Sequence, residues 1–227
     1  MKSEKVRIYY DVLYKKRFSL FVKRFFDIVV SSLMLIMLSP ILLILSIAIK
    51  TDSEGPVLFR QIRVTQYGRH FKIYKFRTMV KNAERIGSQI TSLNDGRITN
   101  VGKILRQYRL DEIPQLINIV QGDMTFVGTR PEVIKYVEKY TDEMMATLLL
   151  PAGVTSETSI QYRNEEKLLS DTDNTDQIYV DIVLPEKMKI NLKSIEDFNI
   201  NKDIKTMIRT VLHVLKKDQE NVATCTD

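Results

Sequence analysis

The longest hydrophobic stretch of the chain runs from Ile28 to Ile49 and contains 22 residues without a charged side chain. At a rise of about 1.5 Å per residue, a straight helix of this length just spans a hydrocarbon core of about 30 Å. Ser39-Pro40 lies in its middle, and a proline inside a helix removes a hydrogen-bond donor and clashes with the preceding turn. The pattern therefore predicts a membrane helix, broken at Ser39 and Pro40, that either crosses the bilayer or enters it and turns back.

Basic residues flank this apolar stretch on both sides. Residues 1–81 contain 16 Lys and Arg against 5 Asp and Glu, whereas residues 82–227 contain 18 against 23. Because basic residues near membrane segments prefer the cytoplasmic side, a helix that crosses the bilayer should show an excess on one flank only. Two interpretations remain open: a single-pass helix with a short basic leader outside, and a re-entrant hairpin with both ends in the cytoplasm.

The leader before the apolar stretch alternates aromatic side chains with Lys and Arg. That composition suits a segment on the membrane surface, with rings at headgroup depth and cations facing anionic lipids. For its first half, up to about Lys16, a disordered basic tail fits equally well. A cleaved signal peptide is not expected, because the apolar stretch starts late and is too long.

After Lys50, two short runs rich in β-branched and aromatic residues predict strands. They are VLFRQIRV (57–64) and FKIYKFRTM (71–79), and the turn residues 66–69 between them predict a β-hairpin. We expect one face of the hairpin to be apolar and the other to carry five cations: Arg60, Arg63, Lys72, Lys75 and Arg77. Such a basic face is either solvated or an anion-binding site.

The remainder of the chain is predicted to be mainly helical. We expect helices at 80–90, at KILRQYRL (103–110), from Asp111 to Gly122, from Pro131 to about Leu150 and at EEKLLS (165–170), with a short strand at MTFVG (124–128). From Ile178 the pattern is helical again. The last helix carries an apolar stripe of period 3.6, which packs on the domain or on the membrane: Ile204, Met207, Ile208, Val211, Leu212 and Leu215.

Composition excludes several kinds of chemistry. The single cysteine, Cys225, and the two histidines form neither a disulfide framework nor a Cys/His metal cluster. The sequence contains no P-loop, no dinucleotide-binding glycine motif and no Ser/His/Asp arrangement. Nucleic acid is not expected as a partner, because the positive charge belongs to the membrane-proximal half and no nucleic-acid-binding module is recognisable.

Asp111 and Glu112 are the most suggestive pair of residues, because they immediately precede Ile113-Pro114 at a predicted helix start. If Asp111 is the N-cap, the unpaired N–H groups and the positive end of the helix dipole favour its ionised form and attract phosphate. An ionised carboxylate held there can act as a nucleophile or as a ligand of a divalent cation. Simple capping of the helix is the alternative interpretation.

Four arginines are close in sequence to this pair: Arg97, Arg106, Arg109 and Arg130. They could form salt bridges only. Guanidinium groups near two helix starts, beside a basic hairpin, also fit the recognition of a diphosphate. A soluble diphosphate substrate and a lipid phosphate could then meet just above the membrane surface, which would explain why the domain is attached there.

At these residues the chain resembles a known family. The matching motifs are KRFFDIVVSS (23–32), Ser39-Pro40, GPVLFRQIRV (55–64), FKIYKFRTM (71–79), RITNVGKILRQYRLDEIPQLINIVQGDMTFVGTRPE (97–132) and DIKTMIRTVLHVL (203–215). They are similar to bacterial sugar transferases of the monotopic phosphoglycosyl transferase family, in its small single-domain form. The resemblance covers roughly residues 20–215.

The resemblance implies a reaction and a site. A re-entrant helix broken at Ser39 and Pro40 would enter only the cytoplasmic leaflet of the bacterial inner membrane. Asp111 and Glu112 would be the catalytic dyad, with Asp111 attacking the β-phosphate of a UDP-sugar and releasing UMP. Undecaprenyl phosphate, or another polyprenyl phosphate, would then take the sugar phosphate from the aspartate. Mg²⁺ would be held at Asp111. From their places on the basic hairpin and near the acidic pair, we expect four arginines to bind substrate phosphates: Arg77, Arg97, Arg106 and Arg130.

Two departures from the family pattern leave the sugar open. The common Gly-Pro-Arg-Pro is Gly128-Thr129-Arg130-Pro131 here, and the missing proline loosens that loop by a backbone-entropy contribution of about 1 kcal/mol. The segment PAGVTSETSIQYRNEE (151–166) has an additional alanine and lacks a second glycine. If this loop takes part in sugar choice, the resemblance does not extend to the identity of the sugar.

Together these features predict an α+β fold, mainly α. We expect a surface leader (1–22), a re-entrant membrane helix (23–50), a cytoplasmic catalytic domain with a short β-hairpin and amphipathic interfacial helices (51–217), and a polar tail (218–227). The expected partners are the UDP-sugar, the polyprenyl phosphate and the membrane, with a possible homodimer, in the first membrane step of surface-glycan synthesis. The alternative is an inactive or non-enzymatic membrane-anchored protein that binds anions.

Overall fold

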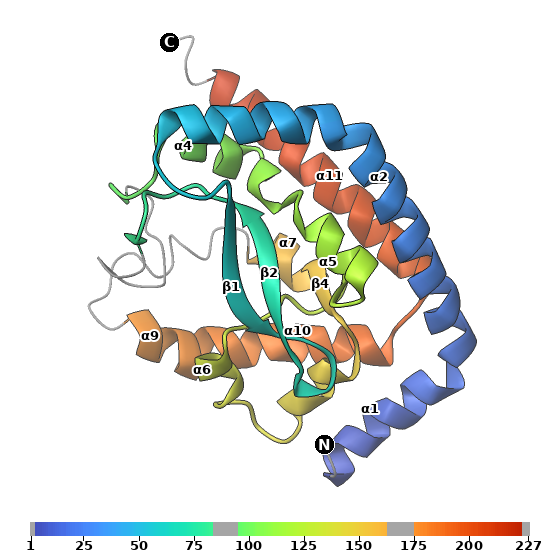
Figure 1. The fold of residues 1–227 in the computed structure, drawn as a ribbon. Helices are drawn as coiled ribbons and strands as arrows, with labels where there is room; N and C mark the ends of the chain where they lie inside the picture. The colour runs from blue at the N-terminus through green and yellow to red at the C-terminus, as the bar shows by residue number, and fades with distance from the viewer. Residues whose placement is uncertain (1–2, 84–94, 163–174, 224–227) are drawn as a thin grey trace.

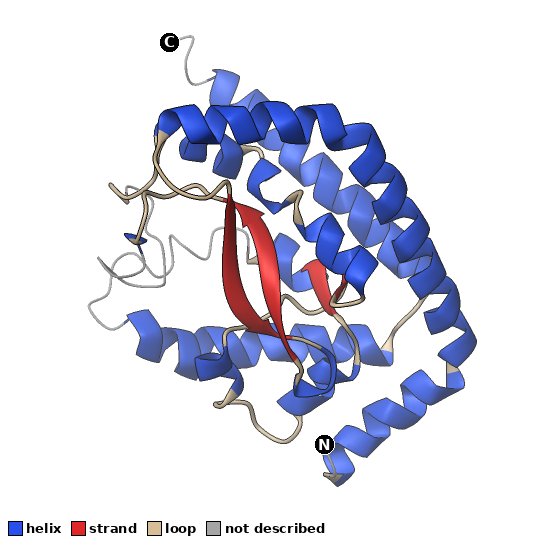
Figure 2. Cartoon of the chain, viewed as in Figure 1, coloured by secondary structure: helices blue, strands red, loops and turns tan. Residues whose placement is uncertain are grey.

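The apolar stretch forms most of one long helix at the edge of the molecule (Figure 1). In the computed structural model, which describes residues 3–83, 95–162 and 175–223, helix α1 (Glu4–Lys15) is followed at once by α2 (Arg17–Asp52). Within the described residues, α2 is the one helix long and apolar enough to cross a membrane. The other described residues are mainly helical, as predicted, and they also contain two small sheets (Figure 2).

Helix α2 is bent rather than straight (Figure 1). Pro40 lies inside it, and the hydroxyl of Ser39 donates to the carbonyl of Ile36 at 2.8 Å. A proline inside a helix commonly produces such a bend. We call residues 17–39 the leading limb and residues 40–52 the return limb. The leading limb packs on a cluster built from α5 and β3, and the return limb packs on a second cluster that includes α4.

Helix α1 packs on the domain. Its buried side chains Val6, Tyr9 and Leu13 contact the C-terminal part of the chain, in a cluster that includes Leu192 and Ile195. The first half of the leader is therefore a helix with one face in the protein core, and a disordered tail up to Lys16 is wrong. The other face leaves several large side chains exposed: Ile8, Tyr10 and Tyr14.

The predicted hairpin is confirmed as strands β1 (Leu58–Val64) and β2 (His70–Phe76), which pair antiparallel around a short 3₁₀ turn (Gln66–Gly68). Its predicted single basic face is wrong. Side chains alternate between the faces of a strand, so cations three positions apart lie on opposite faces. Arg60 and Lys72 are exposed on the outer face, whereas Arg63 and Lys75 lie on the inner face with buried Phe71 and Ile73.

The segment that carries the acidic pair differs from the prediction at its start. Helix α4 (Asn100–Gln107) is followed by a single 3₁₀ turn (Leu110–Glu112) and then by α5 (Gln115–Gln121). The end of α5 at Gly122 is confirmed, because this glycine caps the helix with φ +91°. Asp111 is not the N-cap of α5, however, because Pro114 occupies that position.

A second sheet lies behind the hairpin. Strand β3 (Met124–Val127) is confirmed, and it pairs in parallel with β4 (Ala152–Thr155), which the pattern did not predict. The long helix predicted from Pro131 to Leu150 is wrong, because this segment contains only α6 (Ile134–Val137) and a 3₁₀ segment (Met144–Leu149). Two parallel strands need a crossover between them, and this segment supplies it.

Helices make up most of the described C-terminal part of the chain. They are α7 (Glu157–Gln161), α9 (Thr175–Ile178), a π-helical turn (Tyr179–Val183), α10 (Leu184–Glu196) and α11 (Ile200–Ala223), which confirms the helical prediction from Ile178 onwards. In Figure 1, α11 runs beside α2. Most of the predicted helix at 80–90, the predicted helix at 165–170 and Cys225 lie outside the described residues.

Candidate active site

Three segments far apart in sequence meet at Glu112. The 3₁₀ turn presents Glu112 and Asp111 just after Arg109, whose left-handed backbone (φ +57°) turns the chain sharply after α4. Strand β2 contributes Lys75 from its inner face, and the loop after β3 contributes Arg130. The prediction that Asp111, Glu112 and Arg130 belong to one region is therefore consistent with the structure, which also adds Lys75.

The carboxylate of Glu112 is held by cations on a single oxygen. Its Oε1 accepts hydrogen bonds from Lys75 Nζ and Arg130 Nη2, both at 2.8 Å, and lies 3.8 Å from Arg109 Nη1. Burial alone would raise the pKa of Glu112, but the charges of Arg130, Lys75 and Arg109 outweigh it and hold the pKa well below its usual range. Glu112 is therefore ionised and fixed in place.

Asp111 has a different environment although it is the next residue. Its side chain is buried, with the residue 9% exposed, and no hydrogen bond joins its carboxylate to another described residue. Burial is the largest influence and raises its pKa, the charge of Lys75 lowers it, and the neighbouring charge of Glu112 raises it further. The helix-end effect expected from the sequence is therefore replaced by burial among nearby charges, and the oxygens of Asp111 remain available to a ligand.

The structure places the four arginines predicted to bind phosphate at different locations. Arg130 contacts Glu112, and Arg106, whose Nε donates to Thr78 Oγ1 at 2.9 Å, is close enough for its charge to lower the pKa of Asp111. Arg97 forms an ion pair with Asp95 at 2.6 Å. The hydrogen bonds of Arg77 run to the end of α2.

The loop that carries Arg130 is fixed by its backbone. Gly128 N donates to Thr155 O, and the amide of Val64 in β1 donates to Glu132 O, both at 3.0 Å. Gly128 and Gly153 approach so closely that a Cβ on Gly153 would lie 2.2 Å from the backbone of Gly128. Thr129 stands where the family pattern has a proline, and backbone contacts of this loop with both sheets offset the loosening expected from that difference.

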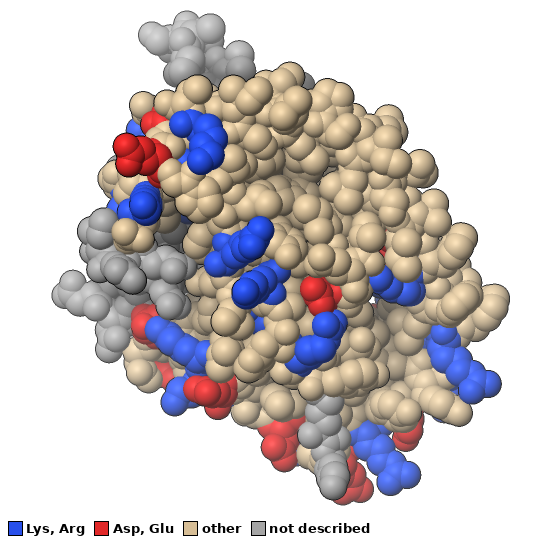
Figure 3. Space-filling model, viewed as in Figure 1, with Lys and Arg blue, Asp and Glu red and all other residues tan. Residues whose placement is uncertain are grey.

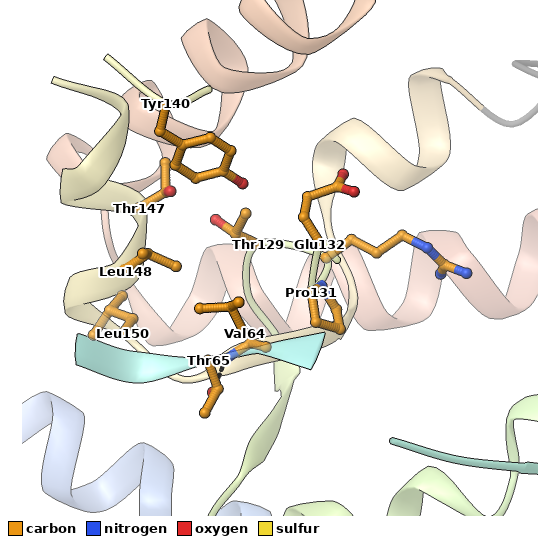
Figure 4. A pocket seen from close by; sticks show the side chains of 11 residues that line it. Val64, Thr65, Thr129, Pro131, Glu132, Tyr140, Thr147, Leu148 and Leu150 are labelled. Atoms are coloured by element: carbon orange, nitrogen blue, oxygen red, sulfur yellow. Dashed lines mark hydrogen bonds between the residues drawn. The ribbon is translucent and has the colours of Figure 1, made fainter. Parts of the chain in front are cut away.

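A small cavity lies behind this loop (Figure 4). Side chains of Tyr140, Thr147 and Thr129 surround one part of it, and Val64, Leu148 and Leu150 surround another. Neither Asp111 nor Glu112 lines it. Burial raises the pKa of Tyr140 well above its usual value. The cavity is thus distinct from the acidic pair.

Sequence reasoning missed two features of this region. The sequence pattern places Lys75 with the outer cations. However, Lys75 lies two residues after Ile73 and four after Phe71 in the same strand, and this alternate spacing puts it on the inner face. Glu132 was not considered at all, yet it is buried, accepts a hydrogen bond from Tyr179 at 2.6 Å and lies 3.6 Å from Lys187. No local pattern could have found that contact, because its partners lie on the π-helical turn and α10.

The carboxylate of Asp111 could be one ligand of a magnesium ion whose other ligands would be water and the phosphates of a substrate. No group of three or more His, Cys, Asp or Glu side chains in the described part of the chain could hold a metal by itself. Mg²⁺ is usually bound by one or two carboxylates together with water and substrate phosphates. The unpartnered carboxylate of Asp111 suits this mode better than Glu112, whose Oε1 is already shared by two cations.

Comparison with known proteins decides the family. The sequence model of the bacterial sugar transferase family matches residues 15–217. The chain belongs to the bacterial sugar transferase family. The match includes the leading and return limbs, the acidic pair and nearly the whole C-terminal helical part, so the site described above lies within the part of the chain that the family model matches.

Several curated relatives have undecaprenyl phosphate in their names. The chain is 42% identical over 124 residues to the UDP-N-acetylgalactosamine-undecaprenyl-phosphate N-acetylgalactosaminephosphotransferase of Aeromonas hydrophila, which covers 55% of this chain and 29% of that protein. It is 37% identical over 195 residues to the UDP-glucose:undecaprenyl-phosphate glucose-1-phosphate transferase of Klebsiella pneumoniae (83% and 39%). For the transferase of that same name in Caulobacter vibrioides, the identity is 31% over 199 residues (86% and 70%). The chain thus spans less than half the length of the first two relatives.

Proposed function

We propose that the protein transfers a sugar-1-phosphate from a UDP-sugar to undecaprenyl phosphate or another polyprenyl phosphate. The observation that carries the proposal is Asp111, a buried carboxylate without a hydrogen-bond partner among the described residues, next to a glutamate held by cations. The names of the relatives support the substrate classes. Because the relatives carry different sugars in their names, the sugar itself is left open.

The chemistry follows from the two carboxylates. An oxygen of ionised Asp111 attacks the β-phosphorus of the UDP-sugar, and the bond from that phosphorus to the oxygen bridging the two phosphates breaks, so UMP leaves with the electron pair. A phosphate oxygen of the lipid then attacks the same phosphorus and releases Asp111, which gives the polyprenyl-diphosphate-sugar. This is covalent catalysis in two displacement steps.

The surrounding residues stabilise charge during both steps. Lys75, Arg109 and Arg130 hold Glu112 in place, and Arg106 and Arg109 are close enough for their charges to act on Asp111. Fixed cations stabilise the charge that develops on phosphate oxygens without the cost of reorganising water. A magnesium ion shared by Asp111 and the phosphates would supply further charge neutralisation.

Contacts at both ends of the apolar stretch support a re-entrant helix on the cytoplasmic face. Asp27, at its start, accepts a hydrogen bond from Thr125 Oγ1 at 2.5 Å. Asp52, beyond its end, accepts one from the backbone N–H of Val101 at 3.1 Å. A helix that crossed the bilayer would place these two carboxylates on opposite sides, whereas here both bind the same folded unit. The protein would thus be monotopic in the bacterial inner membrane.

The test is an assay of the full chain in lipid nanodiscs with a panel of UDP-sugars, Mg²⁺ and undecaprenyl phosphate. We expect UMP release with at least one sugar, and no turnover in Asp111→Asn. Without the lipid, the intact mass of the protein should rise by one sugar phosphate, and this increase should be absent in Asp111→Asn. Asp142→Asn, at an exposed aspartate, is the matched control. Absence of UMP release with every sugar would refute the proposal.

A further inference from the structure

Arg77 closes the end of the membrane helix. It follows strand β2, the residue is 6% exposed, and its Nη2 donates to Ile49 O at 3.2 Å and to Ser53 O at 2.7 Å. The same nitrogen lies 3.0 Å from Ser53 Oγ. The last carbonyls of a helix lack partners within the helix and carry its negative end. A buried guanidinium at this point therefore stabilises the C-terminal end of α2.

The loop after α2 encloses this guanidinium. A Cβ added to Gly55 would lie 2.3 Å from Arg77 Nη1, and the backbone of Gly55 has φ +124°. Nη1 and Nε of Arg77 are buried from solvent without a hydrogen-bond partner among the described residues. Arg77 is therefore closed to a soluble phosphate, and its donors face the protein.

The end of β2 is joined to α4 by further hydrogen bonds. Thr78, the next residue, accepts from Thr99 N at 3.0 Å and from Arg106 Nε at 2.9 Å. Asp52, in the last turn of α2, accepts from Val101 N in the first turn of α4. Three elements thus meet at Arg77: the return limb, the strand that carries Lys75, and the helix that carries Arg106.

Apolar packing continues this connection to the acidic pair. Ile49 of the return limb forms a buried cluster with Phe76 of β2 and Leu105 of α4. Leu110, the residue immediately before Asp111, packs on the same cluster. A shift of the return limb would therefore be transmitted to Asp111 through direct contacts.

We propose that Arg77 is a positioning residue that fastens the return limb of α2 to β2 and α4, and so sets the position of Asp111 relative to the membrane. Under this assignment Arg77 does not bind substrate phosphate. The predicted effect of Arg77 on activity rests on the function proposed above. Its predicted effect on the position of the return limb does not depend on that function. Loss of the contact should move the return limb and leave the leading limb in place.

The position of the helix can be measured directly. In the full chain with Cys225→Ala, a fluorophore is attached to Ile44→Cys on the return limb or to Leu33→Cys on the leading limb, two exposed positions. Quenching by a lipid-bound quencher in nanodiscs reports the depth of each. Arg77→Lys keeps the charge but not the geometry, and Gly55→Ala displaces the guanidinium while keeping every polar group. Both should change quenching at residue 44 and not at residue 33.

A matched control and a milder variant keep the test decisive. Arg60→Lys, on the exposed outer face of the same hairpin, should leave both probes unchanged. If Gly55→Ala does not fold, Ser53→Ala removes only the hydroxyl that contacts Arg77 and should give a smaller shift in the same direction. Unchanged quenching at residue 44 in folded Arg77→Lys would overturn the proposal.

Activity then separates the two possible roles of Arg77. We expect Arg77→Lys to raise KM for the polyprenyl phosphate on the order of tenfold to a hundredfold, with little change in KM for the UDP-sugar, because misplacement by about 1 Å can cost that much. A raised KM for the UDP-sugar with unshifted probes would instead show a phosphate ligand. If the unsubstituted protein shows no turnover, the proposed function fails, and the probe experiment still decides the role of Arg77.

Discussion

At the scale of single residues, the pKa values of two adjacent carboxylates are shifted in opposite directions because their surroundings differ. Glu112 is paired with Lys75 and Arg130, and these charges hold its pKa low. Asp111 is buried without a hydrogen-bond partner among the described residues, so burial raises its pKa. In the proposed displacement, Asp111 would be the nucleophile, and its oxygens are not taken up by hydrogen bonds to described residues. The division of roles follows from packing, since the sequence only shows that the two are neighbours.

The pH dependence of activity should respond to the two neighbours of Asp111 with opposite signs. Lys75 lowers the pKa of Asp111 and Glu112 raises it, so Lys75→Met should raise that pKa and Glu112→Gln should lower it. Because the attacking Asp111 must be ionised, the acid limb of kcat/KM should move to higher pH in Lys75→Met and to lower pH in Glu112→Gln. The measurement is kcat/KM for UMP release by each variant as a function of pH.

Lys72→Met is the control for that experiment, because Lys72 is exposed on the outer face of the hairpin and should leave the acid limb in place. Shifts in the same direction for Lys75→Met and Glu112→Gln would show that Asp111 is not the group that titrates.

At the scale of elements, α5 holds the strand that carries Lys75. Asn118 is fully buried, its Nδ2 donates to Lys72 O, and its Oδ1 accepts from Tyr74 N, both at 2.9 Å. The side-chain amide thereby pairs with the free edge of β2 as a neighbouring strand would. This contact orients Lys75, which lies one residue further along, toward the turn that precedes α5.

Loss of that contact should destabilise the protein measurably. Asn118→Ala leaves a buried N–H and a buried carbonyl of β2 without partners, and each such group costs roughly 1–3 kcal/mol in the free energy of unfolding. Denaturant or thermal unfolding in detergent measures the change. Asn201→Ala, at an exposed position on α11, should be nearly neutral. A loss no larger than that of Asn201→Ala would contradict this role of Asn118.

At the scale of the whole molecule, exposed apolar side chains and charges are separated. The outer surface of α2, along the upper and right edges in Figure 3, is almost free of charge, and exposed residues of α2 form it: Leu33, Ile36, Met37, Ile41, Leu43, Ile44 and Ile47. Basic side chains lie over the hairpin and, at the lower right of this view, beside α1 and the start of α2. Helix α11 packs Met207 inward and exposes the rest of its described stripe: Ile204, Ile208, Val211 and Leu212. Both helices suit a lipid surface.

Labelling of single cysteines decides whether α2 is re-entrant. In the Cys225→Ala background, Lys5→Cys and Lys50→Cys should react with an impermeant thiol reagent from the cytoplasmic side only, because Asp27 and Asp52 are bound to the same domain. Inverted vesicles and intact spheroplasts give the two sides. Asp142→Cys, on the exposed surface of the domain, reports the cytoplasmic side. Reaction of residues 5 and 50 from opposite sides would exclude re-entry.

Much of the fold depends on residues that are close in sequence, so it could be predicted from the sequence. The apolar stretch with Pro40, the hairpin, α4, the end of α5 at Gly122 and the C-terminal helices all follow from periodicity and from turn-forming residues within a few positions. The parallel pair of β3 and β4 was not predictable in this way. Strand β4 has four residues, and its partner lies 28 positions earlier in the register that pairs Met124 with Ala152. Only that contact makes it a strand.

By itself, the sequence determined that a basic chain carries one long apolar helix with a proline inside it, a hairpin and an acidic pair, because hydrophobic period, proline and charge are properties of neighbouring residues. Only the tertiary structure decided what the charged residues do. It directed Lys75 and Arg130 to Glu112, left Asp111 without a partner among the described residues, and placed Arg77 at the end of α2. The physical reason is that hydrogen bonds and burial depend on residues that are distant in sequence and meet only in the folded chain.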